Sequence, residues 1–339
     1  MKFKMKREKL KNIFNIGIII VSASIFLIFA VSSKGLINLV YELKSLNYSW
    51  IFLAVIFMLL YWIIESTTLH IFAVLVQSEY KFYKSFKTTM IGQFFSAITP
   101  FSSGGQPAQI YYMIKSGISG GASTSILAMK FIMFQGIMTI YSIIAIIVKL
   151  SFFQKNLPKF TYICVVSFST NTMVVIFLIF ASTNKRFAGW VLSLIYMSLS
   201  KIKLIKNPEK ILKKLEKELI SFHDSALLMT KNYKSLIETT FLTILQLTCF
   251  FSIPYFIYRS FNASYARFWD MIFAQTFLTM VTSVIPLPGA SGGAEGGFYL
   301  LFGLFFDKDT IISGIILWRI ITYYLAIAVG GIFTIQKEL

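Results

Sequence analysis

The sequence has few of the residues that soluble enzymes and metal centres use. It contains 2 cysteines, 2 histidines and 14 acidic residues among 339. Charged residues make up 14%, whereas a soluble domain averages about a quarter. Cys164 and Cys249 lie in separate apolar segments, which excludes a disulfide framework and a cysteine-rich metal site. His70 and His223 are isolated from each other and from the cysteines, so we predict no metal and no cofactor.

Apolar residues are abundant instead, at 56% hydrophobic and 17% aromatic, with a mean hydropathy of +0.72. The net charge of +18 is compatible with a nucleic-acid binder. However, the basic residues lie between apolar segments, as expected for cytoplasmic loops, and form no stripe interleaved with exposed aromatics. We therefore predict an all-helical, polytopic membrane protein, with residues 1–339 forming one integral membrane domain that binds no nucleic acid.

Apolar runs long enough to cross a bilayer recur along the chain. A span needs about 20 residues, at a rise of 1.5 Å per residue across roughly 30 Å. The basic start MKFKMKREKLK precedes a run from Ile13 to Val31, which indicates an uncleaved first helix with a cytoplasmic N-terminus. The 13-residue run 187–199 either lies in the interface or belongs to a kinked neighbour. The predicted full spans are about 13–33, 50–77, 121–148, 160–182, 236–258 and 311–335.

Residues 201–235 form a basic segment with nine lysines and four acids. Asn207 and Pro208 suit the N-cap and the first position of a helix. Apolar residues then recur at helical spacing from Ile211 to Leu219. We predict a basic amphipathic helix on the cytoplasmic membrane surface. It is a solvated connector, a site for anionic lipid, or a docking element for a separate synthase.

Two stretches interrupt the apolar sequence with proline, serine and glycine. ITPFSSGGQPAQIYYM occupies residues 98–113, and VIPLPGASGGAEGGFYLLF occupies residues 284–302. Aligning Pro100 with Pro288 also aligns two Ser-Gly-Gly triplets, at a constant offset of 188 positions. Proline and glycine break helices, and broken backbone at membrane depth is tolerated only when buried in protein or lining a polar cavity.

Each break predicts a re-entrant hairpin, the first from residue 88 to Lys115 and the second at about 276–306. Counted from a cytoplasmic N-terminus, the first hairpin enters from inside and the second from outside. The units at about 50–148 and 236–335 therefore form an inverted repeat, a design common in transporters.

Three lysines oppose this topology, because Lys149, Lys155 and Lys159 would lie outside the cell, against the usual bias. The alternative to re-entrant hairpins is a pair of ordinary full spans through 88–116 and 268–306.

Four ionisable residues lie within the apolar segments, where such groups are costly and often functional. They are Glu65, Lys130, Glu295 and Arg319. Two acids and two bases suit a polar cavity in which the charges balance. Structural ion pairs that lock helices together are the alternative. No reaction type follows from the acids, because no nucleophile with its base and no nucleotide motif accompanies them.

Neutral polar residues cluster near the first break, and backbone N–H groups at the hairpin tips suit an anion such as phosphate. Close helix packing is the alternative role for the tip glycines. Four glutamines, Gln106, Gln109, Gln135 and Gln275, add neutral donors and acceptors. The candidate lipid-binding residues are Glu65, Ser103, Gly104, Gly105, Gln106, Gln109, Lys130, Ser291, Gly292, Gly293, Glu295 and Arg319.

Three motifs in order carry a family resemblance: TPFSSGGQPAQIYYM, PLPGASGGAEGGF and LWRIITYYL. They resemble the membrane region of lysylphosphatidylglycerol synthase/flippase, the multiple peptide resistance factor, over essentially the whole chain. The resemblance implies a protein of the bacterial plasma membrane that handles phosphatidylglycerol or its lysyl form. It also implies a link to resistance against cationic antimicrobial peptides, with Gln106, Gln109, Glu295 and Arg319 lining the lipid path.

The resemblance leaves the reaction open, because the family's synthase activity lies in a C-terminal soluble domain that uses lysyl-tRNA. The chain ends at Leu339, soon after its last apolar segment. We therefore expect a flippase-like protein of phosphatidylglycerol or a related anionic lipid. The alternatives are a phosphatidylglycerol lysyltransferase and the membrane subunit of a separate synthase, and homo-oligomerisation is left open.

Overall fold

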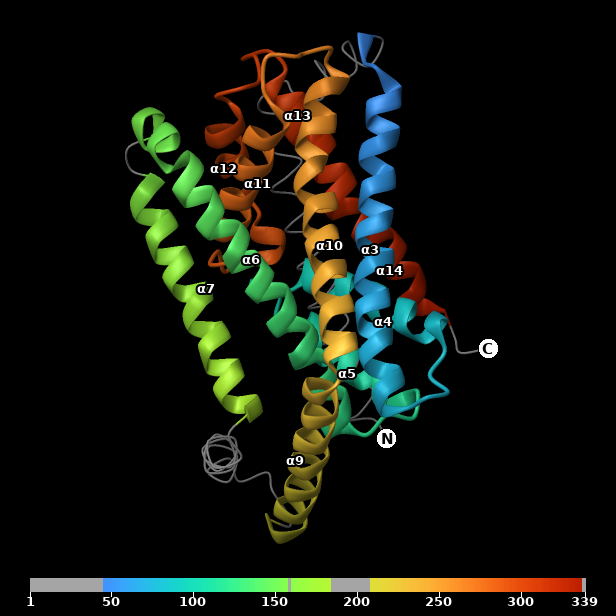
Figure 1. Cartoon of the computed structure of the whole chain (residues 1–339). Helices are drawn as coiled ribbons and strands as arrows, with labels where there is room; N and C mark the ends of the chain where they lie inside the picture. The colour runs from blue at the N-terminus through green and yellow to red at the C-terminus, as the bar shows by residue number, and fades with distance from the viewer. Residues whose placement is uncertain (1–44, 158–159, 184–207, 337–339) are drawn as a thin grey trace.

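The protein is a bundle of helices in a computed structural model that describes residues 45–157, 160–183 and 208–336 (Figure 1). Within those ranges the regular structure is entirely helical, without strands. The helices are α3 (Tyr48–Val76), α4 (Phe82–Ile98), η2 (Pro100–Ser102), α5 (Gly105–Lys115), α6 (Gly120–Asn156), α7 (Phe160–Thr183), α9 (Pro208–Lys231), α10 (Tyr233–Ser260), α11 (Phe268–Thr282), η3 (Pro288–Ala290), α12 (Gly293–Phe302), α13 (Ile311–Arg319), η4 (Ile320–Tyr324) and α14 (Leu325–Ile335).

Four of the described helices are long and apolar enough to cross a membrane: α3, α6, α10 and the continuous helix Ile311–Ile335. These four match predicted spans. Helix α7 lies where the span 160–182 was predicted, and its shorter stretch Tyr162–Val174 is apolar. The predicted first span 13–33 and the segment 187–199 fall outside the described residues.

The long helices alternate in direction, as the predicted order of spans requires. Helices α3, α7 and α13–α14 run towards the end of the bundle where α9 lies, and α6 and α10 run away from it (Figure 1). Helices α3 and α10 pack side by side along the middle of the bundle. Their shared core includes large buried side chains, among them Met58, Trp62 and Phe251.

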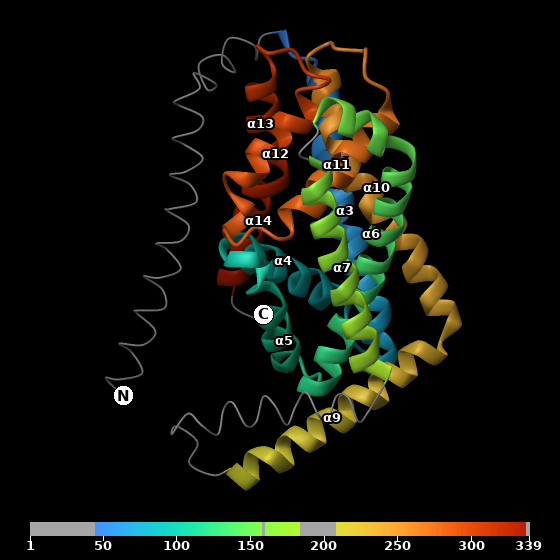
Figure 2. The same cartoon turned by 90° about the vertical axis from the view of Figure 1, so that its left-hand side faces the viewer.

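Both predicted breaks are present as helical hairpins. Helix α4 ends before Pro100 and α5 returns, while α11 ends before Pro288 and α12 returns. The α4–α5 hairpin occupies the half of the bundle nearer α9, and α11–α12 occupies the other half (Figures 1 and 2). The tips η2 and η3 contact each other. With 17 residues, α4 rises only about 25 Å, which is too short to cross a typical bilayer upright.

Helix α6 is longer than predicted and continues past Lys149 and Lys155 to Asn156. Lys149 forms an ion pair with Asp270 in the first turn of α11, at 2.7 Å. This partner gives Lys149 a local role that does not depend on which side of the membrane it occupies. Lys159 falls outside the described residues.

The basic segment forms helix α9, which begins at Pro208 as predicted and packs against the start of α6. The Gly121 amide donates to Glu218 Oε2 at 2.5 Å, and the Ser119 and Ser221 hydroxyls lie 2.7 Å apart. A Cβ at Gly121 would overlap the backbone of Glu218, so glycine is needed for this close approach. Asn207 falls outside the described residues, and placement of α9 on a membrane surface stays a prediction.

Candidate functional site

The two hairpin tips share two successive left-handed residues and then diverge, since ψ is −20° at Ser103 but 139° at Ser291, and φ is −79° at Gly104 but 83° at Gly292. Phe101 and Ser102 have φ of 53° and 54°, and the residues 188 positions later, Gly289 and Ala290, have φ of 57° and 51°. In both tips the serine of the Ser-Gly-Gly triplet donates its hydroxyl to the proline carbonyl, at 2.8 Å. Left-handed φ is costly for residues other than glycine and is found at functional sites. The repeated motif therefore encodes the same first part of the turn in both hairpins.

A polar cavity of about 710 Å³ lies between the first hairpin and helices α3, α6 and α10. Glu65 on α3 and Lys130 on α6 face it and form an ion pair, with Nζ 2.7 Å from Oε1. Gln93 on α4 donates its amide to the second carboxylate oxygen, Oε2, at 2.7 Å. Both charged residues therefore have partners while remaining accessible from the cavity.

A second cavity, of about 450 Å³, lies between α6, α10, α11 and the tip of the second hairpin. Arg319 lines it and pairs with Glu295, with Nε 2.8 Å from Oε1. The other carboxylate oxygen of Glu295 accepts from the Gly292 amide at 2.6 Å, at the start of α12. A carboxylate there is favoured by the helix dipole. Glu295 is therefore held by an arginine and a helix end, and it does not line this cavity.

The second cavity also contains polar atoms that lack partners among the described residues. Arg319 donates Nη1 to the Gly289 carbonyl at 3.0 Å, but its Nη2 makes no hydrogen bond within that part of the chain. Gln275, which lines the same cavity and is 1% exposed, likewise has Oε1 without a described partner. An unpaired buried polar atom is costly. Both atoms are fully buried, so Arg319 and Gln275 line the cavity through other atoms.

The two cavities adjoin at three aromatic side chains. Phe101, Phe131 and Phe134, together with Ser102, line both. The first cavity belongs to the first hairpin and the second to the second hairpin, so the shared aromatics mark the boundary between the two halves. The arrangement is a pair of polar chambers in series, each with one ion pair, separated by apolar rings.

The predicted site residues divide into lining residues and supporting residues. The four ionisable residues form two separate pairs, rather than one cluster of four charges. Ser103, Gln106 and Gln109 line the first cavity, with the Gln109 amide donating to the Thr88 carbonyl at 3.3 Å. In the list of predicted residues, Gly104, Gly105, Ser291, Gly292 and Gly293 are not among those that line either cavity.

The supporting residues shape the turns. A Cβ at Gly105 would overlap Ser96, and one at Gly293 would overlap Ile285, which favours the packing role for these glycines. The Gly104 amide donates to Thr99 Oγ1 at 2.8 Å, and Gly292 has φ of 83°. Anion binding by the tip amides stays a prediction, and the amides of Gly104 and Gly292 already have partners.

Several lining residues were not identified from the sequence. Tyr61, Gln93 and Gln246 line the first cavity, and Thr279 and Tyr323 line the second. The signal for Gln93 and Gln246 was available, because each is a lone amide in an apolar stretch. The aromatic and threonine residues carried no such signal, because they are common in the packed faces of membrane helices.

The chemistry of the site is that of binding polar groups in an apolar surrounding. Across the described residues, no group of three or more histidines, cysteines, aspartates and glutamates is placed to hold a metal ion. What the site offers is one cation with an unpaired donor, a carboxylate that faces a cavity, and neutral amides and hydroxyls. Such groups are suited to replace water around a charged or polar group within an apolar surrounding.

Comparisons with known proteins identify the family. The family described as "Lysylphosphatidylglycerol synthase TM region" matches residues 14–330, which include both hairpins and both ion pairs. A UPF0104 membrane protein from Archaeoglobus fulgidus is 25% identical over 294 residues, covering 84% of this chain and 86% of that protein. The chain is therefore a multi-pass membrane protein that belongs to the lysylphosphatidylglycerol synthase transmembrane-region family.

Proposed function

We propose that the chain translocates a phospholipid, with the polar headgroup passing through the two adjoining cavities while the acyl chains stay in the bilayer. The observation that carries this proposal is a pair of ion pairs, one buried and one partly exposed, each at one of two cavities that adjoin at the hairpin tips. A headgroup crosses hydrocarbon slowly because its charges lose their hydration. Polar chambers in series lower that cost without opening a continuous water channel.

The substrate class that fits is phosphatidylglycerol or its lysyl ester. When the side chains that bury them move aside, Nη2 of Arg319 becomes a donor for a phosphate oxygen, and Gln275 Oε1 becomes an acceptor for a hydroxyl or ammonium group. Arg319 uses Nε and Nη1 within the protein, so its contact to phosphate involves Nη2 alone. Glu65 faces the first cavity and Glu295 does not, so Glu65 is the carboxylate for a lysyl amine.

We further propose that six spans and two re-entrant hairpins form an inverted repeat in the plasma membrane, with the α9 end in the cytoplasm. Hairpins that enter from opposite ends and touch at their tips support the repeat. The lysines of α9 support the cytoplasmic side, by the bias of basic residues towards that side. The bacterial origin rests on the family resemblance, since the relative described above is archaeal.

The proposal is tested with the full chain reconstituted in vesicles that contain fluorescent phosphatidylglycerol. Dithionite bleaches the outer leaflet, and the rate of further bleaching reports translocation. Glu65→Gln should slow the rate about tenfold, because it removes a charge that faces the cavity. The matched control is Glu238→Gln, which removes an exposed carboxylate that also pairs with a lysine, at 3.9 Å. Equal rates in protein-containing and empty vesicles would end the proposal.

The same vesicles distinguish transport from synthesis. Lysyl-tRNA and phosphatidylglycerol are added, and lysyl lipid is measured by mass spectrometry. Product formation by the chain alone would replace transport with lysyltransferase activity as its function. Co-purification of a soluble synthase that is lost on truncation of α9 would instead support the role of a membrane subunit.

A further inference from the structure

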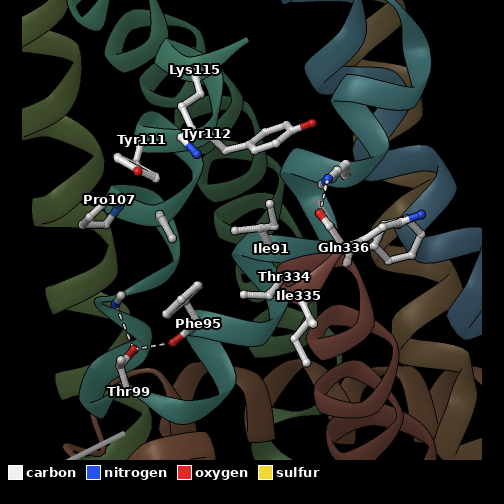
Figure 3. Close-up of a pocket in the computed structure, with 14 residues that line it drawn as sticks. Ile91, Phe95, Thr99, Pro107, Tyr111, Tyr112, Lys115, Thr334, Ile335 and Gln336 are labelled. Carbon is white, nitrogen blue, oxygen red and sulfur yellow. Dashed lines mark hydrogen bonds between the residues drawn. The ribbon is translucent and has the colours of Figure 1, made fainter. Parts of the chain in front are cut away.

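A third cavity lies outside the two chambers, on the other face of the first hairpin. It is a groove of about 810 Å³ between α4, α5 and α14 (Figure 3). Tyr111, Tyr112 and Lys115 of α5 lie on one side of it, and Ile335 and Gln336 lie on the other (Figure 3). The function proposed above does not use this groove.

One end of the groove is strongly basic. It continues into a cavity of about 530 Å³ that shares Lys87, Tyr112 and Lys115 with it and adds Lys81 and Lys84. Within the described residues, no carboxylate lies within 4.0 Å of any of these four ammonium groups. Four positive charges therefore converge without an acidic partner in that part of the chain.

Helix ends account for part of this charge. Lys87 donates to the Gln336 carbonyl at 2.9 Å, where α14 ends, and Lys84 donates to the Ser116 carbonyl at 3.2 Å, where α5 ends. The C-terminal end of a helix carries about half a negative charge. Two such ends offset about one of the four lysine charges, which leaves about three positive charges in excess.

The other end of the groove is apolar. Ile91 and Phe95 lie towards it (Figure 3), whereas the Phe333 ring lies nearer the lysines, 6.5 Å from the Tyr83 ring. The exposed tyrosines Tyr83 and Tyr111 lie beside the lysines, and this combination is typical of the membrane–water interface. A groove with a basic end at the interface and an apolar end has the polarity of a single phospholipid.

We propose that this groove is a resident site for an anionic phospholipid. Lys81, Lys84 and Lys115 bind its phosphate, Lys87 holds the end of α14 in place, and one acyl chain lies along Ile91 and Phe95. A free phosphate would use the lysines and leave the apolar end empty, and a zwitterionic lipid would leave the excess charge uncompensated. The site stands independently of translocation through the two chambers.

The test is native mass spectrometry of the purified full chain after delipidation and addition of defined lipids. The wild-type chain should retain one phosphatidylglycerol at a concentration at which phosphatidylcholine is lost. The double variant Lys81→Gln with Lys115→Gln should weaken phosphatidylglycerol retention by roughly tenfold to thirtyfold. Each interfacial lysine strengthens the attraction of an anionic lipid severalfold, and the two losses multiply. The matched control is Lys234→Gln with Lys308→Gln, two exposed lysines outside the groove, which should leave retention unchanged.

A second variant tests the apolar end without altering charge. Ala108→Trp fills the groove and should also abolish phosphatidylglycerol retention, with thermal unfolding in detergent showing that the fold persists. Equal retention of phosphatidylglycerol and phosphatidylcholine would overturn the proposal, as would an equal loss in the control double variant. Displacement of the lipid by millimolar glycerol phosphate with no effect of Ala108→Trp would identify a free-anion site instead.

Discussion

The two hairpins begin with the same left-handed turn but differ in the conformation that follows and in what stabilises it. In the first, the Gly104 amide donates to the Thr99 hydroxyl; in the second, the equivalent Gly292 amide donates to the Glu295 carboxylate. The residue equivalent to Glu295, 188 positions earlier, is Pro107, which cannot act in this way. The second hairpin therefore ties its turn to a charge, and that charge to Arg319 on the next helix.

The two ion pairs also differ, in how far their side chains are exposed. The side chains of Glu295 and Arg319 are 4% and 5% exposed, whereas those of Glu65 and Lys130 are 11% and 15% exposed and both face the larger cavity. Ser103 and Gln106 of the first hairpin are exposed, while Ser291 is buried. The two hairpins thus use a repeated motif in different ways. The second half is locked around a buried pair, and the first half presents its polar groups to the cavity.

The largest expected effect comes from breaking the buried pair. Glu295→Gln should lower the free energy of unfolding by about 3–5 kcal/mol, because it leaves the Arg319 charge buried and uncompensated and weakens the cap on α12. Glu65→Gln should cost clearly less, because water in the larger cavity solvates Lys130. Thermal and chemical unfolding in detergent measures both. Equal losses would show that the two halves are locked alike.

The next effect concerns the turn residue Gly289. A Cβ there would overlap the Tyr323 ring, and φ is 57°, so Gly289→Ala should destabilise the protein by about 1–3 kcal/mol. The control is Gly136→Ala in α6, where a Cβ meets nothing within 4 Å, and which should be neutral or stabilising by about 0.5–1 kcal/mol. A neutral Gly289→Ala would indicate that the tip adjusts freely.

Arg319→Lys separates the buried pair from the free donor. The lysine ammonium keeps the charge opposite Glu295, but it cannot also donate to the Gly289 carbonyl and replace the Nη2 donor. Translocation should therefore slow about tenfold, while the free energy of unfolding falls by roughly 1 kcal/mol. The vesicle assay and the melting temperature measure the two effects. Lys130→Arg at the other pair is the counterpart and should be mild. If Arg319→Lys transports normally, the free nitrogen has no part in the lipid path.

The smallest expected change in stability comes from making the first tip resemble the second. Phe101→Gly relieves the strain of a side chain at a left-handed position, which stabilises the fold by about 1 kcal/mol. Glycine also raises the conformational entropy of the unfolded chain, which destabilises the fold by a similar amount. The free energy of unfolding should therefore change by less than about 1 kcal/mol. Since Phe101 lines both cavities, translocation should become faster. A slower rate would assign the ring a role in holding the lipid.

Much of the fold could be predicted because helices that cross a membrane need long runs of apolar residues, which are visible in the sequence. The apolar lengths of α3, α6, α10 and Ile311–Ile335, the breaks at Pro100 and Pro288, and the start of α9 at Pro208 all follow from local rules about hydropathy, proline and glycine. Placement of the hairpins within a membrane, and the inverted repeat, stay predictions.

Four charged residues in apolar segments can be recognised without any structure: Glu65, Lys130, Glu295 and Arg319. The tertiary structure decided how they are used. Lys130 pairs with Glu65 rather than with Glu295, one nitrogen of Arg319 is left unpaired among the described residues, and four lysines converge beside α14. Charge is a property of each residue, whereas partnership depends on how helices rotate and pack, and that is set by contacts between segments far apart in the chain.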